Sequence, residues 1–484
     1  MNRLVVVSNR VPTPTAAGAQ AGGLAVALEA LMQQRGGLWF GWSGRTSDAP
    51  AMRMVEDGAV RFATIDLTAE QHQRFYNEFS NATLWPLLHS MPELMTYGRR
   101  NGQVYREVNE RFADRLVPIL REGDLIWVHD YHLMALPAIL RAKGVAAPIG
   151  FFLHIPFPGP DMLTKVPEAA SLVDDLLAAD LIGFQTENDA HNFAEAACRL
   201  RGAERAGANW LMHAGRRVRI GVFPVEIEPR EFADIAQDAW FAAPAERLRR
   251  SLSGQSLVLG VDRLDPTKGL PQRLAGYRRL IERGDKWRRR VTFLQIAAES
   301  RSDVAAYRDL REEIEGVAGN LNSAFAEPDW TPLRLIARAV PRNTIAGYMR
   351  EARVGLVTPL RDGMNLVAKE FVAAQDPQDP GVLILSRFAG AAEQLRSAIL
   401  VNPYDQEEMA DALEQALSMS LADRQARWQQ AWDTIKDTTA LGWGRSFVSA
   451  LLRASTPRKA LSGEGEPASV IQAGRDDGET MRLV

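Results

Sequence analysis

Residues 354–374 read VGLVTPLRDGMNLVAKEFVAA, and the rest of the chain repeats the pattern that this stretch contains. The apolar run 354–359 predicts a buried strand, and residues 366–374 are good helix formers that predict a helix. A short polar turn separates the two. A strand, a tight turn and a helix in this order are typical of an α/β fold with a parallel sheet.

The turn at residues 360–365 is also a candidate ligand site. Unpaired backbone N–H groups at a helix start can receive an anion or a hydroxyl-rich ligand. Gly363 permits close approach of the backbone, and Asp362 and Glu370 supply acceptors for hydroxyls. Our hypothesis is that the turn holds the sugar and nucleotide of an activated-sugar donor. The alternative is an ordinary strand-to-helix turn in which Asp362 is the N-cap.

Apolar runs alternate with helical segments in two series along the chain. The expected strands of the first series are 4–8, 36–44, 125–130, 149–154, 181–186 and 218–225, and those of the second are 257–261, 291–297, 354–359, 381–386 and 399–402. The alternation predicts parallel sheets covered on both faces. We therefore expect an α/β fold with two Rossmann-like domains facing each other across a cleft.

The boundary between the two series is expected within residues 226–253, which contain prolines and many small and charged residues. We divide the chain into a first domain at 1–235 and a second at 236–436. A C-terminal helix at 437–454 is expected to pack back on the first domain. Residues 455–484 are poor in large apolar side chains, which predicts a disordered tail.

Composition excludes several classes of protein. The 484 residues are 46% hydrophobic and 24% charged with a net charge of −3, so nothing favours nucleic acid or an anionic membrane as partner. Cys198 is the single cysteine, which excludes a disulfide framework or a cysteine metal site within one chain. The apolar run at the N-terminus is too short for a signal peptide, and no stretch is long enough to span a bilayer. The cytoplasm is the expected location.

Polar residues fall at or just after the ends of the expected strands, where ligands bind in open α/β sheets. They are Arg10, Asp130, His154, Arg263, Arg301 and Asp362. We interpret this coincidence as a binding cleft formed by the strand ends.

Two cations, Arg263 and Lys268, stand five residues apart just after a strand. An arginine fork and a lysine point charge suit a diphosphate leaving group. The alternative is that both are surface cations pairing with Asp262 and Asp265.

Metal binding is not expected. No Asp-x-Asp pair occurs, so protein cations must neutralise a diphosphate. His129, His132 and His154 with Asp130 have the composition of a metal cluster, but residues 129–132 straddle a strand end, where neighbouring side chains point apart.

Two aromatic residues, Tyr76 and Trp85, permit two interpretations. They are either core aromatics or amphipathic contacts to a sugar phosphate.

Taken together, the motifs resemble trehalose-6-phosphate synthase, a family of retaining two-Rossmann (GT-B) glycosyltransferases. They are VVVSNR (5–10), AGGL (21–24), FSNATLWP (79–86), WVHDYHL (127–133), GFFLHIPFP (150–158), GFQTEND (183–189), VDRLDPTKGLP (261–271), AAESRSDV (297–304) and VTPLRDGMNLVAKEFVAAQDP (357–377). The resemblance runs to about residue 450. It implies synthesis of α,α-trehalose 6-phosphate from UDP-glucose and glucose 6-phosphate without a cofactor, by a homo-oligomer (dimer or tetramer).

The resemblance also implies roles for matching residues. The acceptor 6-phosphate would be held by Arg10, Tyr76, Trp85 and Arg301, and the acceptor hydroxyls by Trp42 and Asp130. The donor diphosphate would be held by Gly22, Gly23, Arg263 and Lys268, the donor glucose by His154, Asp362 and the amides of Gly363, Met364, Asn365 and Leu366, the ribose by Glu370 and the uracil near Val340 and Arg342. The expected catalytic residues are Asp130, His154, Arg263, Lys268 and Asp362. The implied mechanism is a front-face attack in which the donor phosphate accepts the proton.

Two residues depart from the family pattern and two rival functions stay open. Glu226 stands where the family usually has glycine, and Pro266 replaces an aromatic residue. A relative that uses glycerol 3-phosphate to make a glucosylglycerol phosphate is one rival. A catalytically silent sugar-phosphate sensor is the other.

Overall fold

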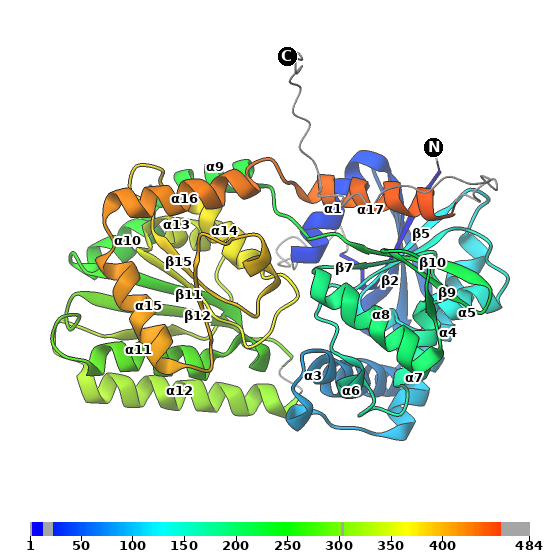
Figure 1. Ribbon diagram of the computed structural model, residues 1–484, viewed down its shortest axis with the longest axis horizontal. Helices are drawn as coiled ribbons and strands as arrows, with labels where there is room; N and C mark the ends of the chain where they lie inside the picture. The colour runs from blue at the N-terminus through cyan, green and yellow to red at the C-terminus, as the bar shows by residue number, and fades with distance from the viewer. Residues whose placement is uncertain (1, 13–22, 302–303, 456–484) are drawn as a thin grey trace, which may run out of the picture.

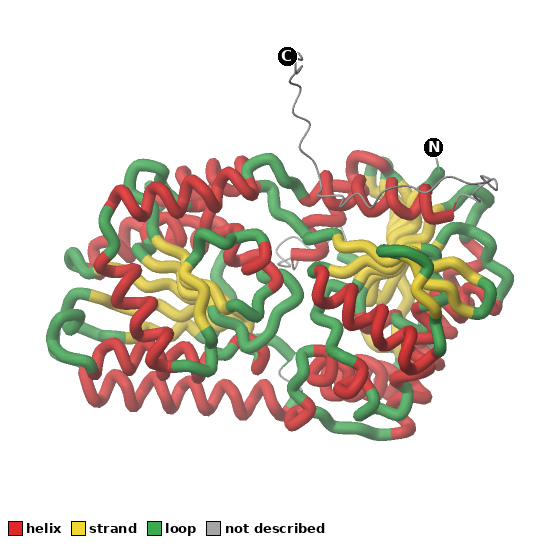
Figure 2. The backbone as a smooth tube through the Cα atoms, in the orientation of Figure 1, coloured by secondary structure: helices red, strands yellow, loops and turns green. Residues whose placement is uncertain are grey.

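The computed structural model describes residues 2–12, 23–301 and 304–455, which form two lobes, each built around one sheet (Figures 1 and 2). The first lobe contains strands β1 to β10 and the second contains β11 to β16. The two Rossmann-like sheets that the sequence predicts are therefore present.

The sheet of the first lobe has ten strands in the order β3-β4-β2-β1-β5-β6-β7-β10-β9-β8. Its seven strands from β4 to β10 are parallel, while β3, β9 and β8 pair antiparallel at the two edges. The strands are β1 (Leu4–Arg10), β2 (Gly37–Thr46), β3 (Met52–Asp57), β4 (Val60–Leu67), β5 (Leu125–His129), β6 (Ile149–Phe152), β7 (Leu181–Phe184), β8 (Glu204–Arg205), β9 (Trp210–His213) and β10 (Arg216–Val222).

The sheet of the second lobe has six parallel strands in the order β13-β12-β11-β14-β15-β16. They are β11 (Ser256–Arg263), β12 (Val291–Ala298), β13 (Leu333–Ile336), β14 (Val354–Val357), β15 (Val382–Ser386) and β16 (Ile399–Val401). The first strand of each lobe, β1 or β11, lies inside its sheet.

Helices cover both sheets (Figure 1). The first-lobe helices are α1 (Gly23–Arg35), α2 (Ala69–Gln71), the π-helix η1 (His72–Leu84), α3 (Trp85–Leu88), η2 (Pro92–Leu94), α4 (Arg99–Leu116), η3 (Val117–Ile119), η4 (Tyr131–Leu133), α5 (Leu136–Ala142), α6 (Pro160–Leu163), α7 (Ala169–Leu176) and α8 (Glu187–Arg201). Those that follow are α9 (Pro229–Trp240), α10 (Ala243–Leu252), η5 (Pro266–Lys268), α11 (Leu270–Glu282), α12 (Ala305–Phe325), α13 (Arg342–Glu351), α14 (Leu366–Ala374), η6 (Gly390–Glu393), α15 (Gln406–Ser418), α16 (Leu421–Ile435) and α17 (Ala440–Ser455). No helix of the described residues is long and apolar enough to cross a membrane.

The segment expected to be a boundary, residues 226–253, contains two helices, α9 and α10. Pro229 and Pro244 lie in the first turn of these helices, where the missing N–H has no intrahelical partner to lose. Since α9 packs against α13 and α14, it belongs with the second lobe, and a boundary at 235/236 falls inside it. We therefore place the boundary before Pro229.

The chain returns to the first lobe at its C-terminal end. Figure 1 shows α16 on the second lobe and α17 beside α1 on the first. The rings of Trp443 and Phe447 in α17 lie 5.0 and 4.4 Å from that of Trp127 in β5. The chain thus crosses between the lobes twice, before α9 and before α17.

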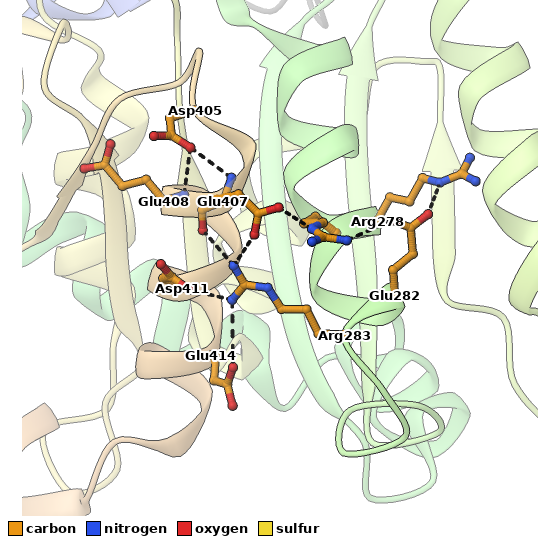
Figure 3. A network of polar contacts seen from close by, with 9 residues as sticks. Arg278, Glu282, Arg283, Asp405, Glu407, Glu408, Asp411 and Glu414 are labelled. Carbon is orange, nitrogen blue, oxygen red and sulfur yellow. Dashed lines mark hydrogen bonds and ion pairs between the residues drawn. The ribbon is translucent and has the colours of Figure 1, made fainter.

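A surface network joins α11 to α15 in the second lobe (Figure 3). Arg283 lies 2.6 Å from Glu407 and 2.5 Å from Asp411, and Asp405 caps the N-terminus of α15 by accepting from two backbone N–H groups. Exposed ion pairs of this kind contribute about 0–1 kcal/mol each. The network holds α15 against α11.

Candidate active site

The two lobes touch where the turn before α14 meets the end of β6. A Cβ atom added to Gly363 would lie 2.2 Å from the His154 carbonyl oxygen. Only glycine permits this approach of two backbones. The contact brings the strand-end residues of both lobes to one place.

The carboxylate of Asp362 is held from two sides. It forms an ion pair with Lys268 and accepts a hydrogen bond from Asn365 Nδ2 at 3.0 Å. The N-cap of α14 is Asn365, which has a φ of 77° and no side-chain cap. The alternative that Asp362 is the helix cap is therefore wrong, because its carboxylate is directed to side chains and not to the amides of the first turn.

The two candidate donor cations do not pair with their sequence neighbours. Lys268 is bound to Asp362, while Asp262 is bound to Arg273. Arg263 is exposed at the end of β11, with its guanidinium carbon 6.0 Å from the centroid of the Trp85 ring. Both cations therefore border the inter-lobe space, where a diphosphate would need them.

Arg273 holds the segment that follows β11 in place. The sequence analysis did not single it out as a functional residue. Its side chain is fully buried, and it donates to Thr358 Oγ1 at 3.0 Å and to the Lys268 carbonyl at 3.2 Å. It thereby ties the segment after β11 to the end of β14. The available signal was an arginine inside the apolar pattern of the helix expected at 269–282.

Of the residues expected at the acceptor, Arg10 and Trp42 are register partners in β1 and β2. The Arg10 guanidinium packs against Gly44, where an added Cβ would lie 2.8 Å from two of its nitrogens. Ring centroids of Trp42 and Tyr76 are 5.6 Å apart. Three of the residues expected at the acceptor thus share one surface.

Trp85 and Arg301, two further residues expected at the acceptor, join the two lobes. The Arg301 guanidinium carbon lies 3.9 Å from the Trp85 ring centroid, and its nitrogens donate to the hydroxyls of Tyr131 at 3.0 Å and Tyr307 at 2.5 Å. Sequence reasoning missed both tyrosines. Tyr131 follows Asp130 at a strand end, which was a usable signal, whereas Tyr307 lies in α12 and reaches the site through tertiary folding.

Asp130 follows the last residue of β5 and has a backbone φ of 73°. Its Oδ1 accepts from the His154 backbone N–H at 3.3 Å. Burial raises the pKa of Asp130 to about 6, and that hydrogen bond and the positive charge of Arg301 oppose the shift. The carboxyl therefore keeps its proton to a higher pH than an ordinary aspartate does.

His154 is hydrogen-bonded to another histidine. Its Nε2 lies 3.0 Å from Nδ1 of His129, and burial lowers the pKa of His154 to about 3. His132 packs elsewhere, 3.9 Å from Tyr131 and 5.7 Å from Tyr76 between ring centroids. Among the described residues, no group of three or more His, Cys, Asp or Glu side chains could hold a metal ion.

The residues expected at the nucleotide gather at the start of α13 and along α14. Arg342 forms an ion pair with Glu370 at 3.1 Å and lies over the Phe232 ring at 4.9 Å. Burial raises the pKa of Glu370, and Arg342 opposes the shift. Val340 and Met364 are buried beside them in the same apolar cluster.

One expected donor contact, Gly22, lies outside the described residues. Gly23 is the first residue of α1.

The departure at Glu226 has a structural counterpart in this chain. The Glu226 carboxylate lies 2.6 Å from the buried Lys369 ammonium and accepts from Gln394 and Thr438, each at 3.0 Å. These contacts join both crossings between the lobes to helix α14. A glycine at this position would leave the Lys369 ammonium buried without a carboxylate.

The departure at Pro266 is accommodated locally. Pro266 opens the short helix η5, whose N-cap Asp265 accepts from the Thr267 N–H at 3.0 Å. Proline suits the first turn of a helix, so the loop keeps Lys268 at the end of this turn.

Comparison with known proteins identifies the family. The profile of "Glycosyltransferase family 20" matches residues 2–453. Trehalose-6-phosphate synthase of Sinorhizobium fredii is 46% identical over 460 residues, covering 94% of this chain and 99% of the relative.

Solved structures of relatives agree with this match. An α,α-trehalose-phosphate synthase (UDP-forming) from Burkholderia xenovorans in complex with glucose-6-phosphate superposes with a TM-score of 0.90 at 44% identity, covering 93% of this chain and 100% of that one. An E. coli protein bound with UDP-2-fluoro glucose superposes with a TM-score of 0.88 at 43% identity, covering 93% and 99%. The chain therefore belongs to the trehalose-6-phosphate synthases of glycosyltransferase family 20, which have the GT-B fold.

Proposed function

We propose that the chain transfers glucose from UDP-glucose to the anomeric hydroxyl of glucose 6-phosphate, giving α,α-trehalose 6-phosphate and UDP. Relatives with glucose-6-phosphate and with UDP-2-fluoro glucose bound support this choice of substrates. The observation that carries the proposal is the contact between Gly363 and His154. It places the Lys268–Asp362 pair of the second lobe beside the strand ends of the first.

In this proposal each lobe supplies most of the contacts to one substrate. The first lobe, with Arg10, Trp42, Tyr76, Trp85 and Asp130, binds glucose 6-phosphate, and Arg301 completes that site from the second lobe. The second lobe, through the turn at Asp362 and the cations Arg263 and Lys268, binds UDP-glucose. The stacking of Arg301 on Trp85 supports a phosphate site shared between the lobes, because an arginine fixed on an aromatic face keeps its donors in one plane.

The reaction would proceed on one face of the donor sugar. The bond between the anomeric carbon and the phosphate oxygen breaks, and the acceptor oxygen bonds to that carbon from the same side. The departing phosphate oxygen takes the acceptor proton. The protein supplies position and charge, with Arg263 and Lys268 stabilising the diphosphate and His154 and Asp362 fixing the sugar ring.

One assay tests the substrates. The purified full chain is incubated with UDP-, ADP- or GDP-glucose and with glucose 6-phosphate or glycerol 3-phosphate, and nucleoside diphosphate release is measured. Release with glucose 6-phosphate, and an α,α product by NMR, is the expected result. Release with glycerol 3-phosphate alone would support the glucosylglycerol-phosphate rival. Absence of release with every pair would support the sensor.

We also propose a homo-oligomer, a dimer or tetramer. Strand β3 is an edge of the ten-stranded sheet, and its side chains Met54 and Val55 are 43% and 50% exposed. Unpaired edge strands with apolar side chains favour association. Light scattering of the wild-type chain and of Val55→Lys tests this, and a monomeric wild type would contradict it. The cytoplasmic location expected from the sequence stays a prediction.

A further inference from the structure

His129 is a buried residue to which the proposed reaction assigns no task. It ends β5 with 1% of its surface exposed. Its Nδ1 lies 3.0 Å from Nε2 of His154, the residue that we propose as a contact to donor glucose. Any effect of His129 on turnover rests on the proposed function, whereas its protonation state does not.

Both imidazoles are neutral near pH 7. Burial lowers the pKa of His154 to about 3, and burial together with His154 lowers the pKa of His129 well below 6.5. A hydrogen bond between two neutral imidazoles requires one N–H and one lone pair. Two arrangements satisfy this requirement, and they give His154 opposite properties toward a ligand.

The surroundings of His129 favour one arrangement. Its Nε2 is buried and makes no hydrogen bond within the described part of the chain. The ring lies among aromatic side chains, with centroids at 4.5 Å for Trp127, 6.4 Å for Trp443 and 6.5 Å for Phe152. An N–H is attracted by the negative face of an aromatic ring, whereas a lone pair is repelled by it.

We infer that His129 is a positioning residue that carries its proton on Nε2 and accepts the His154 Nε2–H on its Nδ1. His154 is thereby held in the tautomer with a bare Nδ1. That nitrogen has no hydrogen bond to any described residue. It is therefore left as an acceptor, and the group that it recognises is a donating sugar hydroxyl.

The tautomers can be read directly in the wild-type protein. The full chain is labelled with 15N-histidine, and long-range 1H–15N correlations are recorded at pH 7 without substrate. His129→Asn identifies the His129 signals, and the change that it causes in its partner identifies those of His154. We expect both rings to be neutral and protonated on Nε2. A proton on Nδ1 of His129 would overturn the inference, and this readout does not depend on any activity.

Two substitutions separate positioning from packing. Asn at position 129 keeps an acceptor near the place of Nδ1, whereas Phe fills the aromatic surroundings and removes it. We expect His129→Phe to lower the turnover number about 10–100-fold with little change in the KM for glucose 6-phosphate, and His129→Asn to lose less than about tenfold. Equal loss in both, or higher activity of the Phe variant, would assign His129 to packing and overturn the proposal.

A histidine outside the site is the control. His213 lies in β9 and is bonded to Asp174 at 2.7 Å. We expect His213→Asn to keep wild-type turnover. Melting curves of all three variants show whether each is folded, and the tautomer measurement on the wild type decides the question if the Phe variant is not. An inactive wild type would reject the proposed function while the tautomer of His129 is still measured.

Discussion

The Lys268 ammonium forms an ion pair with the Asp362 carboxylate across 94 residues of sequence, and the two side chains are only 13% and 16% exposed. Lys268, which we propose as a contact to the donor diphosphate, is thus held in place by Asp362, which we propose as a contact to the donor sugar. A bound diphosphate would share Lys268 with Asp362. The two parts of the donor site therefore act as one unit.

Removing the charge of Asp362 tests this unit. Asp362→Asn keeps an oxygen for hydroxyls and for Asn365 but leaves Lys268 without its counter-ion. We expect kcat/KM for UDP-glucose to fall by roughly a hundredfold, because both the sugar contact and the lysine position are affected. Steady-state kinetics give the value. Asp411→Asn, in the surface network of α15, is the control, and wild-type activity of Asp362→Asn would contradict the assignment.

Arg263 and Arg301 are predicted to act on different substrates. Arg263→Ala removes charge from the diphosphate as it departs, so we expect the turnover number to fall about 10²–10³-fold with a small change in the KM for glucose 6-phosphate. Arg301→Ala removes the guanidinium stacked on Trp85, so the KM for glucose 6-phosphate should rise. A raised acceptor KM as the sole effect of Arg263→Ala would refute its placement at the diphosphate.

Asp130 is predicted to make stability depend on pH. Its carboxyl keeps a proton up to about pH 6 in the folded chain but only to about 3.8 when unfolded, so the folded state binds more protons between these values. The free energy of unfolding should therefore fall as the pH rises from 4 to 6. Asp130→Asn removes this titration. The change that it causes in the free energy of unfolding should therefore be more favourable at pH 7 than at pH 4, by about 2–3 kcal/mol. Urea unfolding at both pH values measures the difference, and an equal effect at the two would count against it. The same variant should lose activity if Asp130 contacts the acceptor.

The Glu226–Lys369 pair is predicted to stabilise the junction of the lobes. Glu226→Ala leaves a fully buried ammonium unpaired and should cost about 3–5 kcal/mol in free energy of unfolding. The double variant Glu226→Ala with Lys369→Met should recover most of this loss. For comparison, Glu407→Ala in the surface network of Figure 3 should cost less than about 1 kcal/mol. Urea unfolding curves, through their midpoints and slopes, give all three values, and a double variant as unstable as the single one would show that the pair is not the cause.

Local elements could be predicted well where buried strands and good helix formers alternate. The helix expected at 366–374 has the bounds of α14. The strand expected at 125–130 corresponds to β5, which ends one residue earlier, at His129. Strand β3 was missed because five of its six residues are exposed, so no apolar pattern marks it. The π-helix η1 and the helices α4 and α12 were missed as well. Pro229 and Pro244 do not mark an irregular domain boundary, because proline breaks a helix in its interior but is tolerated in its first turn.

The sequence by itself determined that there are two sheets, the central strands of each and the polar residues at the strand ends, because hydrophobic period and turn chemistry are encoded within a few neighbouring residues. The tertiary structure alone decided which of those residues meet. Lys268 pairs with Asp362 and not with the two aspartates nearer in sequence. Arg301 donates to Tyr131 across the lobes, and His129 is hydrogen-bonded to His154, which follows the adjacent strand. Such partners depend on strand order, on the packing of one lobe against the other and on burial. No local pattern of residues contains that information.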